Sequence, residues 1–335
     1  MRFTETDVAG SASVMPDEQH LQVEINDSAH PRIAILMCTY NGAVYLRQQL
    51  DSLAEQTVTD WTLYVSDDGS TDATREVLAD YQQRWGKDRL VVFDGPRKGF
   101  AENFISLIQR PAVRGDHFAF SDQDDVWFRD KLERSLSRLE SVSQKVPALY
   151  CSRTRIVDAS GNVIGQSPLF TRPLCFQNAL VESIAGANTM LINQAARNLL
   201  LQLPDQAPLV AHDWLTYQLV TGSGGRIIYD AVPRLDYRQH GGNLIGANAT
   251  LGDRLMHLRG MLSGRFVRWN DANTFILKKM CLLLTEENRE TLAMFDVGRK
   301  MGLMNRVSAL RKAGVYRQTR HGNLSLFLAS CLGRV

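Results

Sequence analysis

The N-terminal half of the chain alternates short apolar runs with segments that carry apolar residues at helical spacing. "RIAILMCTY" (residues 32–40) is an apolar run of strand length, and "VYLRQQLDSLAEQ" places Leu46, Leu50 and Leu53 on one helical face. The same alternation continues through the strand-like "WTLYVSDDG", "RLVVFDG" and "HFAFSD" and the helix-like "STDATREVLADYQQRW", "FAENFISLIQ" and "RDKLERSLSRLE". This pattern predicts a mostly parallel sheet with helices on both faces.

The regular alternation of predicted strands and helices ends at Ala148. "ALYCSRTRIVDASGNVIG" predicts two strands around a turn at residues 160–162, followed by a short strand, "NTMLIN", and a helix from Gln194. "HDWLTYQLV" predicts a short helix and "RIIYDAVPRLDYRQH" further strands. From Leu251, apolar residues recur at helical spacing among Arg and Lys, which predicts two to four amphipathic helices.

These patterns divide the chain into three parts. Residues 1–30 lack periodicity and large apolar clusters, so we expect a mobile tail. The α/β domain is expected to cover residues 31–248, in two halves over residues 31–145 and 146–248. A basic helical region is expected over residues 249–335.

Charge and cysteine usage narrow the functional classes. The net charge of +2 conceals an asymmetry, because from Asp253 onward there are 15 Lys and Arg against 6 Asp and Glu. The five cysteines form no close pair and no metal-ligand spacing, which favours reduced thiols over disulfides or zinc ligands. No apolar run approaches the roughly 20 residues that span a bilayer, and no signal peptide is recognisable, so we expect a cytoplasmic protein.

Polar clusters follow three of the predicted strands, at residues 39–41, 67–68 and 122–125. Because ligands of such sheets bind beyond the carboxyl ends of the strands, the three clusters should converge. Three carboxylates within four positions repel one another, and an Asp-x-Asp at a strand end offers the hard oxygen ligands that Mg²⁺ or Mn²⁺ prefers. The alternative is a solvated acidic turn in which Asp125 or Asp130 caps the next helix.

The other two clusters and one loop are candidates for binding a nucleotide. Asp68 in "VSDDGSTD" could accept a hydrogen bond from the N3–H of a pyrimidine, while Ser70, Thr71 or Asp72 caps the helix that follows. "CTYNG" offers Thr39, Tyr40 and Asn41 to a nucleoside, and "GPRKGFAENF" offers Arg97 and Lys98 to a diphosphate. Each of these segments could instead be an ordinary turn.

Together these motifs resemble a known family. "ILMCTYNGAVYLRQQLDSLAEQT", "LYVSDDGSTDAT", "GFAENF" and "SDQDDVWFRDKL" are similar, in order and spacing, to motifs of the family 2 inverting glycosyltransferases over about residues 32–140. "GANTMLIN", "HDWLTYQL" and "YRQHGGNLIGAN" resemble the later part of bacterial rhamnosyltransferase-like members that build O-antigen and other surface polysaccharides, to about residue 248. The resemblance implies the nucleotide-diphospho-sugar transferase fold of the GT-A type.

The resemblance also implies roles for individual residues. Asp213 of "HDW" would be the catalytic base, and Asp124 would ligate Mg²⁺ or Mn²⁺ directly, with Asp122 and His240 as further metal or diphosphate contacts. The donor-binding candidates are Thr39, Tyr40, Asn41, Asp68, Lys98, Asn103 and Asp122. One departure is Gln123, which stands in the middle of the acidic motif where the family often has Ala or Asp.

The implied reaction is transfer of a sugar with inversion, for which we expect L-rhamnose from a dTDP donor and a lipid-linked or polymeric glycan acceptor. A single in-line displacement requires a carboxylate base on one face and a stabilised diphosphate on the other, but no covalent intermediate. Two alternatives remain open: a UDP-hexose transferase of the same fold, and a non-catalytic protein that binds nucleotide sugars or glycans. A sugar nucleotidyltransferase is disfavoured because no Gly-rich phosphate loop is present.

The basic C-terminal region has two interpretations. Its Arg and Lys residues are interleaved with Leu, Met, Phe and Val, which suits helices that lie on an anionic membrane surface. The alternative is a helical bundle that packs on the catalytic domain and has a solvated face. We expect peripheral membrane association, because a lipid-linked acceptor would lie at the membrane, and we expect no nucleic-acid partner.

Overall fold

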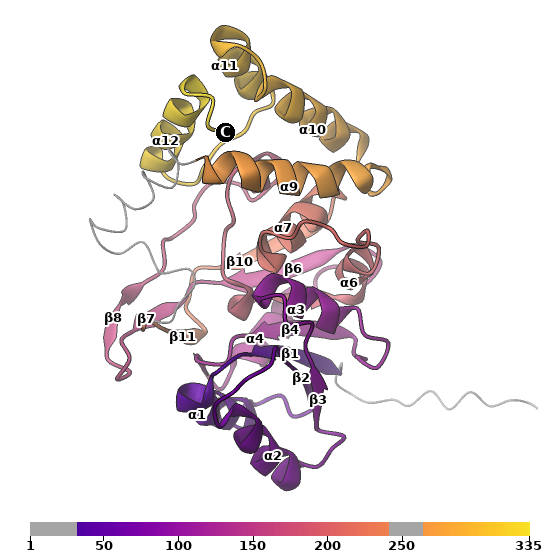
Figure 1. Cartoon of the computed structure of the whole chain (residues 1–335), viewed down its shortest axis with the longest axis vertical. Coiled ribbons are helices and arrows are strands. Elements are labelled where there is room, and N and C mark those ends of the chain that lie inside the picture. Colours follow the sequence, from indigo (N-terminus) through magenta and orange to yellow (C-terminus); the bar gives the residue numbers. More distant parts are fainter. Residues whose placement is uncertain (1–31, 241–263) are drawn as a thin grey trace, which may run out of the picture. The chain divides into compact units, whose positions relative to one another are not determined.

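The computed structural model describes residues 32–240 and 264–335, and all of them belong to one compact unit. The N-terminal half alternates strands and helices as the sequence predicts (Figure 1). Its elements are β1 (Ile33–Thr39), α1 (Ala43–Ala54), β2 (Trp61–Asp67), α2 (Thr74–Trp85), β3 (Leu90–Asp94), α3 (Phe100–Ile108) and β4 (His117–Ser121). Strands β4, β1, β2 and β3 lie side by side in this order, and each is parallel to its neighbours.

Alternate residues of β1 point into two separate cores, one on each face of the sheet. Ile33, Ile35 and Met37 pack in the cluster that includes α1, α2 and α4 (Lys131–Leu139), whereas Ala34 and Leu36 pack in the cluster that includes α3 and α7 (His212–Gly222). Successive side chains of a strand point to opposite faces, so a strand covered on both faces must be apolar throughout. This requirement explains the uninterrupted apolar run that the sequence shows here.

The second half extends this sheet and adds a smaller one. Its elements are β5 (Val126–Trp127), α4 (Lys131–Leu139), β6 (Ala148–Ser152), β7 (Arg155–Val157), β8 (Val163–Gln166), α5 (Phe176–Ala179), η1 (Ala187–Thr189), β9 (Leu191–Asn193), α6 (Gln194–Leu200), α7 (His212–Gly222), β10 (Arg226–Asp230) and β11 (Leu235–Arg238). The main sheet has the order β10-β6-β9-β4-β1-β2-β3, in which β9 is antiparallel to β4 and β6. The smaller sheet has the order β5-β11-β7-β8. The predicted hairpin is the antiparallel pair β7–β8.

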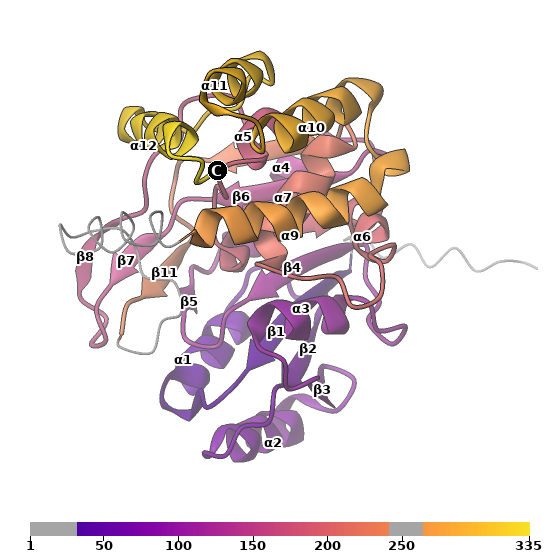
Figure 2. The same cartoon turned by 45° about the horizontal axis from the view of Figure 1, so that its top comes forward.

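The C-terminal helices pack on the second half of the sheet domain. They are α9 (Arg265–Lys279), η2 (Cys281–Leu283), α10 (Glu286–Gly298), α11 (Leu303–Lys312) and α12 (Arg320–Cys331), and Figures 1 and 2 show α9 lying against α7. Ile276, Leu277 and Phe295 share one core with Tyr217 of α7, and Asn288 Nδ2 donates to two carbonyls at the end of α7. None of the described helices is long and apolar enough to cross a membrane.

The sequence prediction was wrong about the capping residues of α2 and α4. Helix α2 begins at Thr74, so neither Ser70 nor Thr71 caps it. Asp72 accepts hydrogen bonds from the backbone N–H and hydroxyl of Thr74 in a turn before the helix. Asp130 does stand at the N-cap of α4, but its side chain makes no capping bond and instead pairs with Arg234. These polar side chains bind other loops, so they were not available as caps.

Candidate active site

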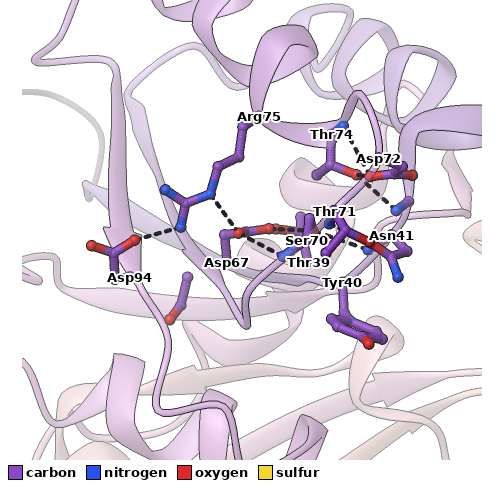
Figure 3. Close-up of polar contacts among 12 residues, drawn as sticks. Thr39, Tyr40, Asn41, Asp67, Ser70, Thr71, Asp72, Thr74, Arg75 and Asp94 are labelled. Atoms are coloured by element: carbon purple, nitrogen blue, oxygen red, sulfur yellow. Dashed lines mark hydrogen bonds and ion pairs between the residues drawn. The ribbon is translucent and has the colours of Figure 1, made fainter.

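Asp67 is the buried centre of the loops that follow β1 and β2 (Figure 3). Its Oδ1 accepts a hydrogen bond from Thr39 Oγ1 at 2.9 Å, and its Oδ2 accepts one from Arg75 Nε at 2.7 Å and one from the N–H of Ser70 at 3.1 Å. Burial raises the pKa of this carboxyl, but the hydrogen bonds from Ser70, Arg75 and Thr39 outweigh burial and hold the pKa below its ordinary value. Asp67 therefore joins the ends of β1 and β2 as an anion.

The loop that carries Tyr40 and Asn41 is tied to the loop after β2. Asn41 has φ 48°, in the left-handed region, its N–H donates to Ser70 Oγ at 2.9 Å, and its Oδ1 accepts from the N–H of Thr71 at 2.8 Å. The Tyr40 side chain is 59% exposed and points away from this network (Figure 3). The loop is held by its backbone, so the Tyr40 ring remains available for contact with a ligand.

Asp68 lies on the opposite face of β2 from Asp67 and holds the loop after β3. Its Oδ1 accepts the N–H of Arg97 at 2.6 Å, and its Oδ2 accepts the N–H of Gly99 at 2.9 Å. Lys98 is exposed on this loop. Asn103 of α3 is buried and pairs with Ser66 through both ends of its side-chain amide. Asp68 thus holds the loop that carries Lys98, and Asn103 lies near it, because a Cβ added to Gly95 would be 2.7 Å from both Asp68 Oδ1 and Asn103 Oδ1.

The acidic motif after β4 lies beside the other two clusters. Asp124 Oδ2 lies 2.8 Å from His240 Nε2, and Arg238 Nε donates to the backbone carbonyl of Asp124 at 3.1 Å. Burial, with the neighbouring charges of Asp124 and Asp213, raises the pKa of Asp122 to about 7. Burial also raises the pKa of the Cys38 thiol on β1, and the charges of Asp122 and Asp68 add to this effect. The predicted convergence of the three strand ends is confirmed.

Asp125 has a different environment from its neighbours. It is fully buried, its Oδ2 accepts a hydrogen bond from Asn188 Nδ2, and burial raises its pKa well above the ordinary value. Lys131 is also buried, with Nζ 3.4 Å from the centre of the Trp127 ring, and burial lowers its pKa to about 7. Asp125 therefore supports the motif from inside the protein, and it does not cap the next helix.

Asp213 lies in the first turn of α7 and faces the acidic motif. Burial raises its pKa to about 6, although the N–H groups of Trp214 and Ala187 donate to it and oppose the rise. The positive end of a helix dipole also favours an anion here. At neutral pH this carboxylate is therefore ionised and can accept a proton, and its pKa is near the value that suits a general base.

The donor set fits a hard divalent cation. Asp122, Asp124 and His240 supply carboxylate and imidazole groups, and burial raises the pKa of Asp122, with the charge of the nearby Asp124 adding to the rise. Within residues 32–240 and 264–335, no group of three or more His, Cys, Asp or Glu side chains has a metal-binding arrangement. Such a group is not required, because Mg²⁺ is usually held by one or two carboxylates together with substrate phosphates.

Sequence reasoning placed Asp67 in one of the three polar clusters but assigned no separate role to Asp67, Gln123 or His212. The signal for Asp67 was present, because Leu63, Val65 and Asp67 alternate along β2 and share the face covered by α1 and α2. The contacts of Gln123 depend on a loop 83 positions away, so no local pattern reveals them.

The chain is similar in sequence to known glycosyltransferases. Residues 34–186 match the family model described as Glycosyl transferase family 2. The chain is 29% identical over 245 residues to the dTDP-rhamnosyl transferase RfbG of Shigella flexneri, covering 69% of this chain and 81% of that protein. It is 27% identical over 165 residues to a putative teichuronic acid biosynthesis glycosyltransferase, TuaG, of Bacillus subtilis (strain 168). This match covers 49% of this chain and 63% of that protein.

The fold is also similar to that of a solved structure. The crystal structure of S. aureus TarS residues 1–349 in complex with UDP superposes with a TM-score of 0.54 at 15% identity, covering 90% of this chain and 88% of that one. The complex of the same fragment with UDP-GlcNAc gives a TM-score of 0.51 at 15% identity, covering 85% and 93%. At these identities the likeness concerns the fold alone.

Proposed function

We propose that the chain, whose residues 34–186 match the family 2 glycosyltransferase model, is a nucleotide-sugar glycosyltransferase that transfers L-rhamnose from a dTDP donor with inversion. The observation that carries the proposal is the convergence of Asp213 with Asp122 and Asp124 at one edge of the sheet. A carboxylate that can accept a proton thus lies beside carboxylates suited to a cation. The name of the Shigella flexneri relative supports the choice of dTDP-rhamnose.

The nucleoside of the donor would lie along the ends of β1 and β2. In this arrangement the Tyr40 ring contacts the nucleoside, and Asp68 accepts a hydrogen bond from the pyrimidine N3–H. Asp68 already accepts the N–H groups of Arg97 and Gly99, but a carboxylate has about four acceptor positions and can accept a further bond. The exposed Lys98 on the same loop would face the diphosphate.

The acidic motif would hold the cation. Asp124 is the direct ligand in this proposal, with Asp122 and His240 beside it, and the cation is Mg²⁺ or Mn²⁺. When bound, such a cation stabilises the departing nucleoside diphosphate as a Lewis acid, an effect worth several kcal/mol. The buried Asp125 and the backbone contact from Arg238 keep Asp124 in place.

Asp213 would act as the general base. Its Oδ1 accepts the N–H of Trp214 at 2.7 Å, which fixes the carboxylate at the start of α7. An acceptor hydroxyl placed against its other oxygen would lose its proton as it attacks the anomeric carbon, and a positioned base of this kind contributes about 10²- to 10⁴-fold to the rate.

The acceptor would be a lipid-linked or polymeric glycan, with the C-terminal region on a membrane surface. Residues 264–335 carry 13 Lys and Arg against 5 Asp and Glu. On α12 and at its C-cap, Leu324, Phe327 and Leu332 are more than half exposed at helical spacing, and Arg320 and Arg334 flank them. An exposed apolar stripe bordered by cations is complementary to an anionic lipid surface.

A donor panel tests the proposal. The purified protein would be incubated with Mn²⁺ and dTDP-rhamnose, UDP-glucose or UDP-N-acetylglucosamine, and its thermal unfolding recorded. A ligand at 100 times its Kd stabilises the folded protein by about 2.7 kcal/mol, so dTDP-rhamnose should raise the melting temperature most. A larger rise with a UDP-hexose would identify that donor instead. Binding without transfer to any glycan acceptor would favour a non-catalytic binding protein.

A further inference from the structure

Gln123 joins the acidic motif to the loop that follows β1. Its Oε1 accepts a hydrogen bond from the backbone N–H of Tyr40 at 3.0 Å, and its Nε2 donates to the backbone carbonyl of Tyr40 at 3.1 Å. Both ends of the amide are therefore bound to one residue of a distant loop. The glutamine amide pairs here with both backbone groups of Tyr40, as a residue of a neighbouring strand would.

Gly42 leaves the space that this contact needs. A Cβ added to Gly42 would lie 2.1 Å from Gln123 Oε1 and 2.4 Å from Gln123 Cδ, distances that real Cβ atoms do not show. The φ of Gly42 is −104°, which any residue can adopt, so backbone conformation does not demand a glycine at this position. The glycine is required because the glutamine amide occupies the place of a side chain.

The position of Gln123 gives this contact a consequence for ligand binding. Asp122 and Asp124 are its two chain neighbours, so any shift of the acidic motif is transmitted through the amide to Tyr40. The N–H groups of Asn41 and Gly42 are held by Ser70 Oγ and Thr74 Oγ1, which fix the other side of the same loop. The loop is thus pinned both to the strand end of β2 and to the acidic motif.

We propose that Gln123 is a positioning residue that holds the Tyr40 loop in register with the carboxylates of the acidic motif, so that one donor can bind by its nucleoside and its diphosphate together. The inference rests on the proposed function, because it requires a nucleoside at the Tyr40 loop and a cation–diphosphate at the motif. The amide is suited to this task because it has both an acceptor for the Tyr40 N–H and a donor for the Tyr40 carbonyl.

The test compares Gln123→Ala, Gly42→Ala and the double variant with the wild-type protein. Dissociation constants of dTDP, UDP and inorganic pyrophosphate would be measured calorimetrically with Mn²⁺ present, and melting temperatures recorded without ligand. We expect each single variant to weaken nucleotide binding about tenfold, as loss of two neutral hydrogen bonds suggests, with pyrophosphate binding unchanged. Because both substitutions remove the same contact, the double variant should bind nucleotide no more weakly than Gln123→Ala. Gln202→Ala, at an exposed site on another element, is the control.

The outcomes separate positioning from the alternatives. Equal loss of nucleotide and pyrophosphate binding would mean that Gln123 contacts the cation or diphosphate directly, and would overturn the inference. Additive losses in the double variant, or unchanged nucleotide affinity in Gln123→Ala, would overturn it as well. A wild-type protein that binds pyrophosphate with Mn²⁺ but neither nucleotide would refute the proposed function, and the inference with it.

Discussion

His240 Nε2 lies 2.8 Å from Asp124 Oδ2, so the end of β11 meets the acidic motif that follows β4. Arg238, two positions earlier, donates to the backbone carbonyl of Asp124 and fixes the same approach. The smaller sheet carries these residues to the site, because β11 is paired with β5, which begins directly after the motif. A side chain from the second half of the domain therefore reaches the acidic motif, which belongs to the first half.

Replacing Asp124 tests the cation site. We expect Asp124→Asn to reduce transfer at least 100-fold and to weaken Mn²⁺ binding, because the amide keeps the shape of the side chain but loses its charge. Chelator should abolish the activity of the wild-type protein, and added Mn²⁺ should restore it. Asp80→Asn removes the same charge from an exposed pair on α2 and should leave transfer unchanged. Full activity of Asp124→Asn would refute the metal assignment.

Replacing Asp213 tests the general base. We expect Asp213→Asn to lower kcat about 10²-fold or more while the affinity for the donor is retained. The raised pKa of about 6 gives a second signature, because the protonated acid cannot accept a proton. The wild-type kcat should therefore fall about tenfold for each pH unit below 6. The residual kcat of Asp213→Asn should not show this decrease at acidic pH. Weakened donor binding with normal kcat would instead assign Asp213 a structural role in α7.

Replacing Asp68 tests the nucleoside contact. We expect Asp68→Ala to raise the KM for the donor, because it removes the acceptor for the pyrimidine and releases the N–H groups of Arg97 and Gly99. Asp68→Asn retains an acceptor for the loop, so it should raise the KM less than Asp68→Ala. An unchanged KM in both variants would leave Asp68 with a role in the turn alone.

Much of this architecture could be predicted because it follows from local rules. The apolar run of β1 predicts a strand covered on both faces, and the helical spacing of Leu46, Leu50 and Leu53 predicts a helix that packs on one of these faces. The structure contains both elements in this arrangement. The convergence of Thr39, Asp68 and the acidic motif also followed, because parallel strands end at one edge of the sheet.

The remaining details depend on contacts between distant residues. Ser70 was expected to cap α2, but its hydroxyl binds Asp67 and accepts the N–H of Asn41. Nothing in the sequence near Gln123 indicates that its amide pairs with Tyr40, since the partner is defined only once β1 and β4 are adjacent. In these cases a hydrogen bond to a residue at the end of another strand outweighed the local preference of the polar side chain for a helix cap or a turn.

The exposed face of α12 predicts salt-sensitive membrane binding. We expect the protein to sediment with anionic liposomes and to remain in solution with neutral ones, because the cations of residues 264–335 attract anionic headgroups by up to about 1 kcal/mol each. Leu324→Ser with Phe327→Ser should abolish sedimentation, whereas Val163→Ser with Ile164→Ser, on the exposed strand β8, should not. Equal sedimentation with both kinds of liposome, or with neither, would refute membrane binding.

His212 predicts a loss of stability in acid. Its ring stacks on Phe104 at a centroid distance of 4.0 Å and lies 5.1 Å from the ring of Phe120, and neither ring nitrogen has a hydrogen-bond partner among the described residues. Burial lowers the pKa of His212 from 6.5 to about 3. The unfolded chain therefore binds a proton that the folded protein rejects, and this contribution to stability is lost as the pH falls from about 6.5 towards 3.

The expected loss is about 2 kcal/mol between pH 7 and pH 5, since one unit of pKa difference corresponds to about 1.4 kcal/mol. His212→Phe places an uncharged ring in the same aromatic site, so its melting temperature should fall less than that of the wild type over this range. His212→Leu, with a smaller apolar side chain, controls for overpacking by the Phe ring. Both variants should show the smaller change of melting temperature with pH, whatever their stability at pH 7. Parallel slopes in the wild type and both variants would show that acid destabilises the protein through other groups.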